Sequence, residues 1–490
     1  MIRNSKYLLI LLLAIISYDA EAQYSQVLYN MNLPQNHLLN PALRPGNRVY
    51  IGLPVLSGVN ININNNFINF SDVIIKGQTD SLISFLHPDY DIDKFLAKIK
   101  DKNSIEPEVT IPLFSLGFSA GKDLYIFLDI NERFEGNVVL PGDIIKLGLK
   151  GNEQFVGTKI DLSSLRGDIK YYREIGLGFS KDFTNKLRIG VKGKLLFGIA
   201  SASIDNKSLG ITVNDDYSHT VDADMVVNFS APLSVSMTPD NKIDKFTFDD
   251  SRFDNRSGIV DFLKNTGNVG FGFDLGATYN ITDKFVMSAA VTDIGFIKWK
   301  TDLTNLSAKS SFKFSGLNME NVLNGTMTFD SLANEMLDSL KNSFILSDTK
   351  NPFTTNLPYG VTFGASYNLT KSFSVGLLSY SRVIGKQIRE SLTLSANVNL
   401  SNALSASFAY TAANHRYDNL GAGLALRVGF FQFYTVVDRI PVTWNKVISE
   451  GGDAFPVPVS WNTINARLGF NFVFGNKIKK KDDRPMVLVE

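Results

Sequence analysis

Long segments in which apolar and polar residues alternate constrain the fold of this chain more than any other feature. From Phe271 to Tyr279 every odd position except Ala277 is a large apolar or aromatic residue, and every even position is small or polar. Similar alternation runs over 187–197, 392–400 and 464–474. Successive side chains point to opposite faces of a strand, so each segment has one apolar and one polar face. Each is about ten residues long, enough for a tilted strand to cross a membrane, whereas strands of soluble β-sandwiches usually have about five or six residues.

The connections between such segments have two lengths. Short turns rich in Asn, Asp, Ser and Thr, residues that suit tight turns, cover 182–186, 280–284, 368–372 and 399–403. Long polar stretches cover 135–170, 200–267, 300–358 and 439–461. Counting back from the last segment brings the turns over 399–403 and 368–372 to one rim directly, and the other two join them if each long stretch between holds an even number of strands. The sequence therefore predicts an all-β fold, a transmembrane antiparallel β-barrel of about 14 strands (12–16) with its short turns in the periplasm. The least regular strand candidates are 202–215 and 221–237.

The first residues have the pattern of an export signal. Arg3 and Lys6 precede an apolar run of about ten residues, which is shorter than the roughly 20 that a spanning helix needs, and small residues follow up to Ala22. We predict a signal peptide over 1–22, cleaved near Ala22. The barrel is expected over 23–475 with an N-terminal segment, 23–47, followed by a charged periplasmic tail, 476–490. This places the chain in the outer membrane of a Gram-negative bacterium.

Composition argues against several classes of function. The chain has no cysteine, which excludes disulfides and zinc–thiolate sites, and its net charge of +1 gives no field for nucleic acid. Its four histidines lie apart, without metal-ligand spacing, at His37, His87, His219 and His415. A barrel phospholipase would need a histidine on a strand beside a serine, and none of the last three lies in a clear strand. We predict no enzyme, cofactor or metal site.

Helical periodicity is rare. Ile92, Phe95, Leu96 and Ile99 predict a short helix over 91–101, which either covers the barrel mouth or plugs the lumen. A second helix, starting near Asp330, is expected in an extracellular loop. The charged tail is interpreted either as a solvated run or as a peptide that docks a partner.

The polar faces of the alternating segments supply the candidates for the lumen. These candidates are Tyr172, Glu174, Arg188, Lys192, Lys194, Asp274 and Arg467. Their charges are either paired with acidic loops or line a path that favours anions. The glycines from Gly267 to Gly276 lack the lysine and helix of a phosphate loop, so we interpret them as room on the lumenal face.

Several segments resemble known barrels. Residues 34–42, 50–54, 64–70 and 467–475 resemble an uncharacterised family of Gram-negative outer-membrane barrels. The hairpin that contains 274–279 is more loosely similar to the superfamily of long-chain fatty-acid transport porins, which includes barrels that serve type IX secretion. That resemblance implies about 14 strands and an N-terminal lumenal segment. It carries no residue of a fatty-acid site over to this chain.

Two functions are compatible with these features. The first is passage of a small or amphiphilic solute through the barrel, and the alternative is a non-conducting structural subunit of a secretion or surface-assembly complex. The predicted partners are outer-membrane lipid, with either a small amphiphilic ligand or an envelope protein, and no nucleic acid. Exposed Tyr279, Tyr367 and Tyr410 are expected near the membrane interfaces. The same facing assignment predicts that Leu275→Arg costs about 2–4 kcal/mol and that Asp274→Arg is better tolerated.

Overall fold

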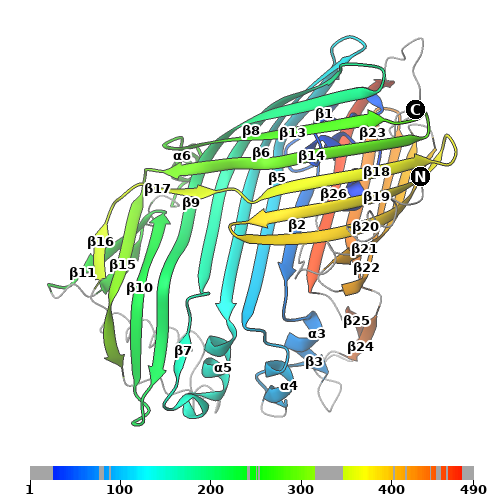
Figure 1. Ribbon diagram of the computed structural model, residues 1–490. Helices are drawn as coiled ribbons and strands as arrows, with labels where there is room; N and C mark the ends of the chain where they lie inside the picture. Colours follow the sequence, from blue (N-terminus) through cyan, green and yellow to red (C-terminus); the bar gives the residue numbers. More distant parts are fainter. Residues whose placement is uncertain are drawn as a thin grey trace, which may run out of the picture.

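The wall of the molecule is a closed antiparallel β-barrel of 14 strands, which confirms the predicted fold (Figure 1). This computed structural model describes residues 26–476 except 77–81, 88–89, 240–242, 250, 252–253, 315–345, 401–402, 414–415, 442, 449–453 and 459–461. In order around the wall the strands are β1 (Asn47–Gly52) with β2 (Val59–Asn65), β5 (Lys102–Ser119), β6 (Leu124–Pro141), β8 (Arg166–Asp182), β9 (Leu187–Val213), β13 (Asn268–Asn280), β14 (Phe285–Trp299), β18 (Tyr359–Asn368), β19 (Phe373–Ile384), β20 (Gln387–Leu400), β21 (Leu404–Ala413), β22 (Arg416–Val428), β23 (Phe431–Ile440) and β26 (Thr463–Asn476). β1 and β2 act as one interrupted strand because both pair with β5 and with β26, which closes the barrel.

Short turns gather at one end of the barrel, the short-turn rim. They cover 120–123, 183–186, 281–284, 369–372 and 429–430, and the connection from β20, which ends at Leu400, to β21, which begins at Leu404, lies at the same rim. All four predicted connections are at this rim, and the turns over 120–123 and 429–430 were not recognised in the sequence. The other end, the long-loop rim, carries the long connections, but it also carries the two-residue turn 385–386 between β19 and β20.

Three helices lie beyond the long-loop rim, outside the lumen: α3 (Phe70–Val73), α4 (Ile92–Leu96) and α5 (Gly142–Lys150) (Figure 1). The helix expected over 91–101 is α4, which is therefore a loop helix and not a plug. Its Phe95 stacks on Phe85, with ring centroids 4.3 Å apart. The signal peptide, the helix expected near Asp330 and the tail beyond Asn476 lie outside the described residues.

The two least regular strand candidates form β-structure beyond the wall. Residues 187–198 of β9 pair with β13, whereas residues 201–213 pair with β10 (His219–Ser230). β10 in turn pairs with β15 (Leu303–Phe314), so the sheet continues past the barrel on the side away from β19–β22 (Figure 1). Because the barrel closes through β13 and β14, these strands add no member to the wall.

The remaining short helices and strands lie in the loops and at the rims of the barrel. They are β3 (Ile74–Lys76), β4 (Leu82–Ser84), η2 (Glu153–Phe155), β7 (Lys159–Asp161), β11 (Leu233–Met237), β12 (Ile243–Phe248), α6 (Arg256–Leu263), β16 (Leu346–Thr349), β17 (Phe353–Asn356), β24 (Trp444–Ile448) and β25 (Ala454–Pro458).

The faces of the wall follow the alternation in the sequence. On β13, Leu275 is 45% exposed on the outer face, while Asp274 beside it is 0% exposed on the inner face. Tyr279 and Tyr367 are exposed next to the short-turn rim, and Tyr410 is exposed nearer the other end. The apolar side chains thus form the outer face of the wall, and the polar side chains line the lumen.

Leu275→Arg is expected to lower the free energy of unfolding by about 2–4 kcal/mol, because the guanidinium would face hydrocarbon near the bilayer midplane. Urea unfolding in lipid vesicles, followed by gel mobility with and without boiling, measures this loss. Val428→Arg is the matched control, since Val428 ends β22 at the short-turn rim with 79% exposure, where the same change costs about 0–1 kcal/mol. Equal losses in the two variants would contradict the facing assignment.

Candidate functional site: the lumen and its plug

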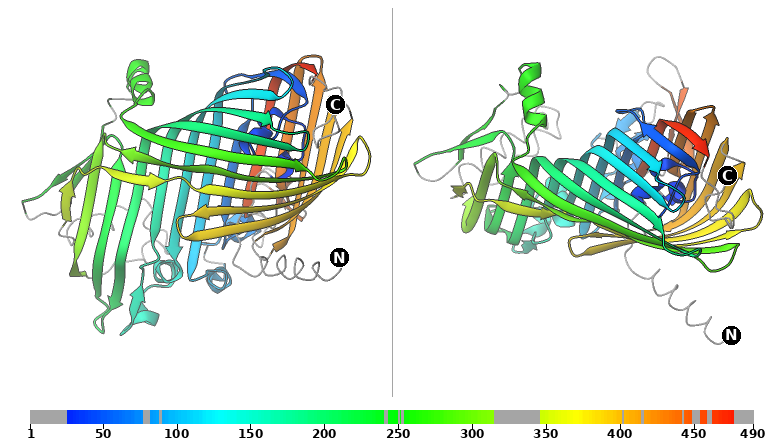
Figure 2. Two further views of the ribbon diagram at one scale, coloured as in Figure 1. Left: turned by 45° about the horizontal axis from the view of Figure 1, so that its top comes forward. Right: turned by 90° about the horizontal axis from the view of Figure 1, so that it is seen from above.

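The lumen is occupied by residues 26–46, called the plug below, which precede the first strand. The plug contains α2 (Gln26–Tyr29) and η1 (Pro34–Leu38), and all but two of its residues are buried. Figure 2 shows this segment in dark blue, enclosed by the wall. It falls within the N-terminal segment expected over 23–47.

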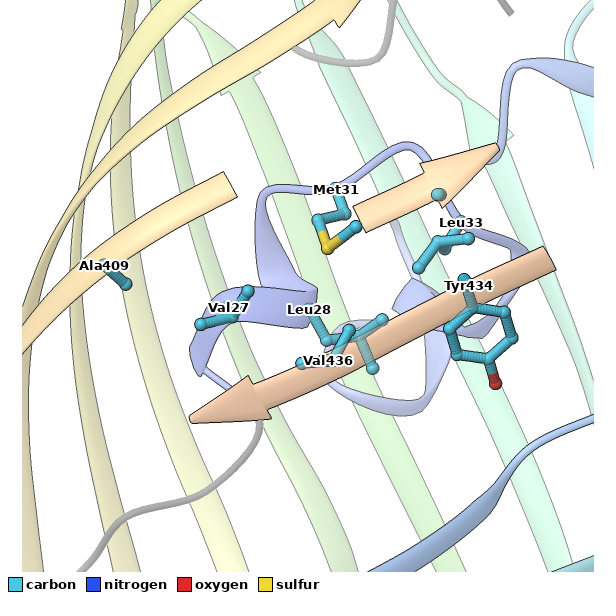
Figure 3. Close-up of a cluster of buried hydrophobic side chains, with 8 residues drawn as sticks. Val27, Leu28, Met31, Leu33, Ala409, Tyr434 and Val436 are labelled. Atoms are coloured by element: carbon cyan, nitrogen blue, oxygen red, sulfur yellow. The ribbon is translucent and has the colours of Figure 1, made fainter. Parts of the chain in front are cut away.

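Apolar packing holds one side of the plug against β21, β22 and β23. Val27, Leu28, Met31 and Leu33 form one buried cluster with wall residues (Figure 3). These wall residues are Ala409, Ala425, Tyr434 and Val436. Burial of apolar side chains stabilises the plug because their surface is removed from water.

Glycines on the inner face of the wall make room for the backbone and side chains of the plug. A Cβ atom at Gly190 would lie 2.1 Å from the carbonyl carbon of Pro41, and one at Gly276 would lie 2.0 Å from Oδ1 of Asn40. At Gly423 it would lie 2.3 Å from the sulfur of Met31. The interpretation that Gly276 leaves space on the lumenal face is therefore confirmed, and the plug occupies this space.

Polar contacts anchor both ends of the plug. The backbone N–H of Val27 donates to Oδ1 of Asp438 at 2.8 Å on β23. Near the short-turn rim, Arg44 donates to the carbonyl of Ser180 at 2.6 Å and forms an ion pair with Asp182 at 3.2 Å. Between them, Nε2 of His37 lies 2.8 Å from Oδ2 of Asp129 on β6. The plug is thus bound to several strands that are far apart in the sequence.

Arg133 on β6 is the centre of a buried network of ion pairs. Its Nη1 lies 2.9 Å from Glu174 and 2.8 Å from Asp293. Its Nη2 lies 2.8 Å from Glu135 and 3.4 Å from Glu108. One guanidinium therefore joins carboxylates from β5, β6, β8 and β14. Charged groups that leave water are stable only when they are paired and hydrogen-bonded in this way.

The two buried lysines of β9 extend this network. Nζ of Lys192 lies 3.0 Å from both Asp129 and Glu174. Nζ of Lys194 lies 2.7 Å from Asp274 and 2.5 Å from Asp293. Because Asp129 also contacts His37, the network connects the wall to the plug.

A β-bulge places Asp293 in this network. The pairing of β13 with β14 shifts register at this point, and Asp293 has a φ of +63°. Its backbone N–H donates to Oδ1 of Asp274 at 2.7 Å. Bulges re-aim side chains, and this one turns a carboxylate toward Lys194 and Arg133.

The structure places every lumen candidate on the inner face, and all of them are buried: Tyr172, Glu174, Arg188, Lys192, Lys194, Asp274 and Arg467. Tyr172, Glu174, Lys192, Lys194 and Asp274 meet in or beside the network. Tyr172 joins it through its hydroxyl, which donates to Glu135 at 2.6 Å. Arg188 lies apart, paired with Asp182 at 2.6 Å near the short-turn rim. Arg467 lies near the plug and contacts Asn60 at 3.4 Å.

Two expectations about these charges need correction. The partners of Lys192, Lys194 and Arg188 are carboxylates of the wall strands, not of acidic loops. Asp274→Arg is now expected to be poorly tolerated, because it would replace one of the two carboxylates that contact Lys194 with a second cation. His219 also differs from its expected place in a polar stretch without a strand, since it begins β10.

Other members of the network were not recognised in the sequence. They are Glu108, Asp129, Arg133, Glu135, Asp293 and Arg382. For three of them a signal existed, because Asp129, Arg133 and Glu135 all occupy odd positions of β6, while even positions beside them hold the apolar residues Leu128, Ile130 and Phe134. Asp293 had none, since the bulge breaks the alternation there.

Two of the pockets in the lumen lie toward its opposite ends. The plug–wall pocket, about 510 Å³ with its open side included, is lined by residues that include Tyr29, Leu43, Arg188, Thr278, Val286 and Ser366, near the short-turn rim. The mouth pocket, about 360 Å³ by the same measure, lies toward the long-loop rim, and its lining includes Asn62, Glu108, Glu135, Asn137, Asp168 and Ile384.

In the described ranges, no helix is long and apolar enough to cross a membrane. No group of three or more His, Asp or Glu residues that could hold a metal ion occurs among the residues described.

Similar solved structures include other barrels. One is the toluene transporter TodX of Pseudomonas putida, with 10% identity over 92% of this chain and 93% of that chain and a TM-score of 0.37. A TodX deltaS2S3 mutant monoaromatic hydrocarbon channel has 12% identity over 93% of this chain and 98% of that chain, with a TM-score of 0.41. A Pseudomonas aeruginosa FadL homologue has 10% identity over 93% of this chain and 95% of that chain, with a TM-score of 0.39. The chain is loosely similar to these barrels. No curated protein matches the sequence at a significant level. The model of a family of unknown function, DUF5723, matches residues 41–438, in agreement with the resemblance noted in the sequence. The chain therefore belongs to the family of unknown function DUF5723.

Proposed function

We propose that this protein is an outer-membrane transporter that passes a small amphiphilic solute along the plug, without catalysis. The short-turn rim then faces the periplasm, as in other outer-membrane barrels. The plug–wall pocket is the last binding site on the route, because its lining comes from the short-turn ends of β9, β13, β14, β18 and β19.

The mixed lining of the plug–wall pocket carries this proposal. Leu43 and Val286 offer apolar surface, while Arg188 offers a cation. Thr278 and Ser366, 4% and 7% exposed, line the pocket with hydroxyl oxygens that have no hydrogen-bond partner among the described residues. Pockets for small molecules combine apolar walls with a few polar groups of this kind, and buried hydroxyls without a partner leave binding capacity for a ligand.

Uptake of radiolabelled 1-octanesulfonate into proteoliposomes tests the proposal. This probe has an apolar chain and a permanent charge, so it crosses lipid slowly by itself. Purified protein is expected to raise uptake above that of protein-free vesicles. The double variant Thr278→Val, Ser366→Ala is expected to lower this protein-dependent uptake roughly tenfold, since each lost hydrogen bond weakens binding by about 0.5–1.5 kcal/mol.

Thr393→Val is the matched control, because Thr393 is also an inward hydroxyl but contacts Thr411 at 2.8 Å outside the pocket. Its uptake is expected to equal that of the wild type. No uptake by the wild type, together with stable co-purification of an envelope protein, would favour the alternative of a non-conducting structural subunit.

A further inference from the structure

The mouth pocket contains buried oxygen atoms that lack a donor. They are Oδ1 of Asn62, Oε2 of Glu135, Oδ1 of Asn137 and Oδ1 of Asp168, and none has a hydrogen-bond partner in the part of the chain that the structure describes. Asn62 and Glu135 are only 2% and 3% exposed, so their oxygens are shielded from bulk water. Because buried polar atoms in native proteins nearly always have a partner, this group of acceptors requires either a ligand or bound water.

The two cations that line the mouth pocket, Lys170 and Arg382, already have partners. Nζ of Lys170 lies 2.8 Å from Oδ2 of Asp168 and donates to the carbonyl of Asn356 at 3.1 Å. Arg382 lies 3.1 Å from Glu108, and Arg133 pairs with Glu135 from behind the pocket. The pocket therefore presents acceptors and carboxylates to whatever occupies it.

We infer that the mouth pocket binds the protonated amino group of a small primary amine. An ammonium group has three N–H donors and no acceptor, which complements a surface of acceptors. The same lumen already holds ammonium groups between oxygens, since Lys192 lies between Asp129 and Glu174, and Lys170 lies between Asp168 and the carbonyl of Asn356. This site goes beyond the proposed transport, because it lies at the opposite rim from the plug–wall pocket.

A single-cysteine reporter tests the inference. The wild-type chain has no cysteine, and Ile384 lines the mouth pocket, so Ile384→Cys places one thiol there. The rate of its modification by N-ethylmaleimide, an uncharged reagent, is measured in n-butylammonium chloride and in equal concentrations of potassium or tetramethylammonium chloride. At ten times its dissociation constant, n-butylammonium is expected to slow labelling about tenfold. Potassium and tetramethylammonium, which have no N–H donors, are expected to leave the rate unchanged.

Substitutions at Asn62 test whether the acceptor oxygens bind the amine. Oδ1 of Asn62 has no hydrogen-bond partner among the described residues, so its removal breaks no hydrogen bond within the protein. In the Ile384→Cys background, Asn62→Leu is expected to raise the half-protecting concentration about tenfold, as for the loss of one hydrogen bond to a charged group. Asn62→Asp is expected to lower it, since it adds a carboxylate. A second reporter, Thr278→Cys in the plug–wall pocket, is expected to show no protection by n-butylammonium.

Equal labelling rates in n-butylammonium and potassium would overturn the inference and leave a pocket that holds only water. Protection by calcium ions without protection by n-butylammonium would also overturn it, in favour of a metal site. Either result would leave uptake of 1-octanesulfonate unchanged, so failure of this inference is distinguishable from failure of the proposed transport.

Discussion

Arg133→Met is expected to lower the free energy of unfolding by about 3–5 kcal/mol, the largest loss from any single change considered for this barrel. The substitution retains much of the side-chain volume but removes the cation that contacts Glu108, Glu135, Glu174 and Asp293. These carboxylates would then remain buried near one another without their shared partner, which costs far more than the loss of an exposed pair. Urea unfolding in lipid vesicles, monitored by tryptophan fluorescence, measures the difference.

Lys313→Met is the matched control for the loss of a cation. Lys313 of β15 pairs at 2.7 Å with Asp216 in the turn between β9 and β10, but both side chains are more than half exposed. Pairs of this kind contribute about 0–1 kcal/mol. If Arg133→Met lowered stability no more than Lys313→Met does, the network would not stabilise the barrel.

Gly190→Leu is expected to displace the plug and open the lumen to ions. The new Cβ atom would lie 2.1 Å from the carbonyl carbon of Pro41 and 2.3 Å from the nitrogen of Ala42, both of them backbone atoms that cannot rotate away. In planar bilayers the wild type is expected to give no steady current, because the plug packs against the wall on several sides. The variant is expected to give a steady current at least about tenfold above the leak of a protein-free bilayer, as a barrel with a water-filled interior does.

Gly193→Leu is the control on the same strand. Gly193 faces outward on β9, and no atom lies within 4 Å of the position of its Cβ. This variant is expected to remain closed. Gly276→Ala provides a milder displacement, since its Cβ would meet the Asn40 side chain at 2.0 Å, and is expected to give intermediate current. A folded Gly190→Leu barrel without current would show that the plug does not need the space at Gly190.

The sequence by itself determined the wall of this protein. Whether a residue faces lipid or lumen depends on the parity of its position within a strand, which is a local property. This is why the facing of Leu275 and Asp274, and the rim of the four predicted turns, could be read directly. Where the local pattern is interrupted, the prediction fails. The bulge at Asp293 was missed, and the strands over 202–215 and 221–237 belong to the part of the sheet that continues past the barrel, not to the wall.

Only the tertiary structure decided what the inner face contacts. Parity places Lys194 in the lumen, but the choice of Asp274 and Asp293 as its partners depends on strand register and on the tilt that the closed barrel imposes. Contacts across the lumen, such as Arg382 with Glu108, join residues that are hundreds of positions apart. The plug has no alternation to reveal its place, and its fit depends on glycines from several strands that form one surface only after the barrel has closed.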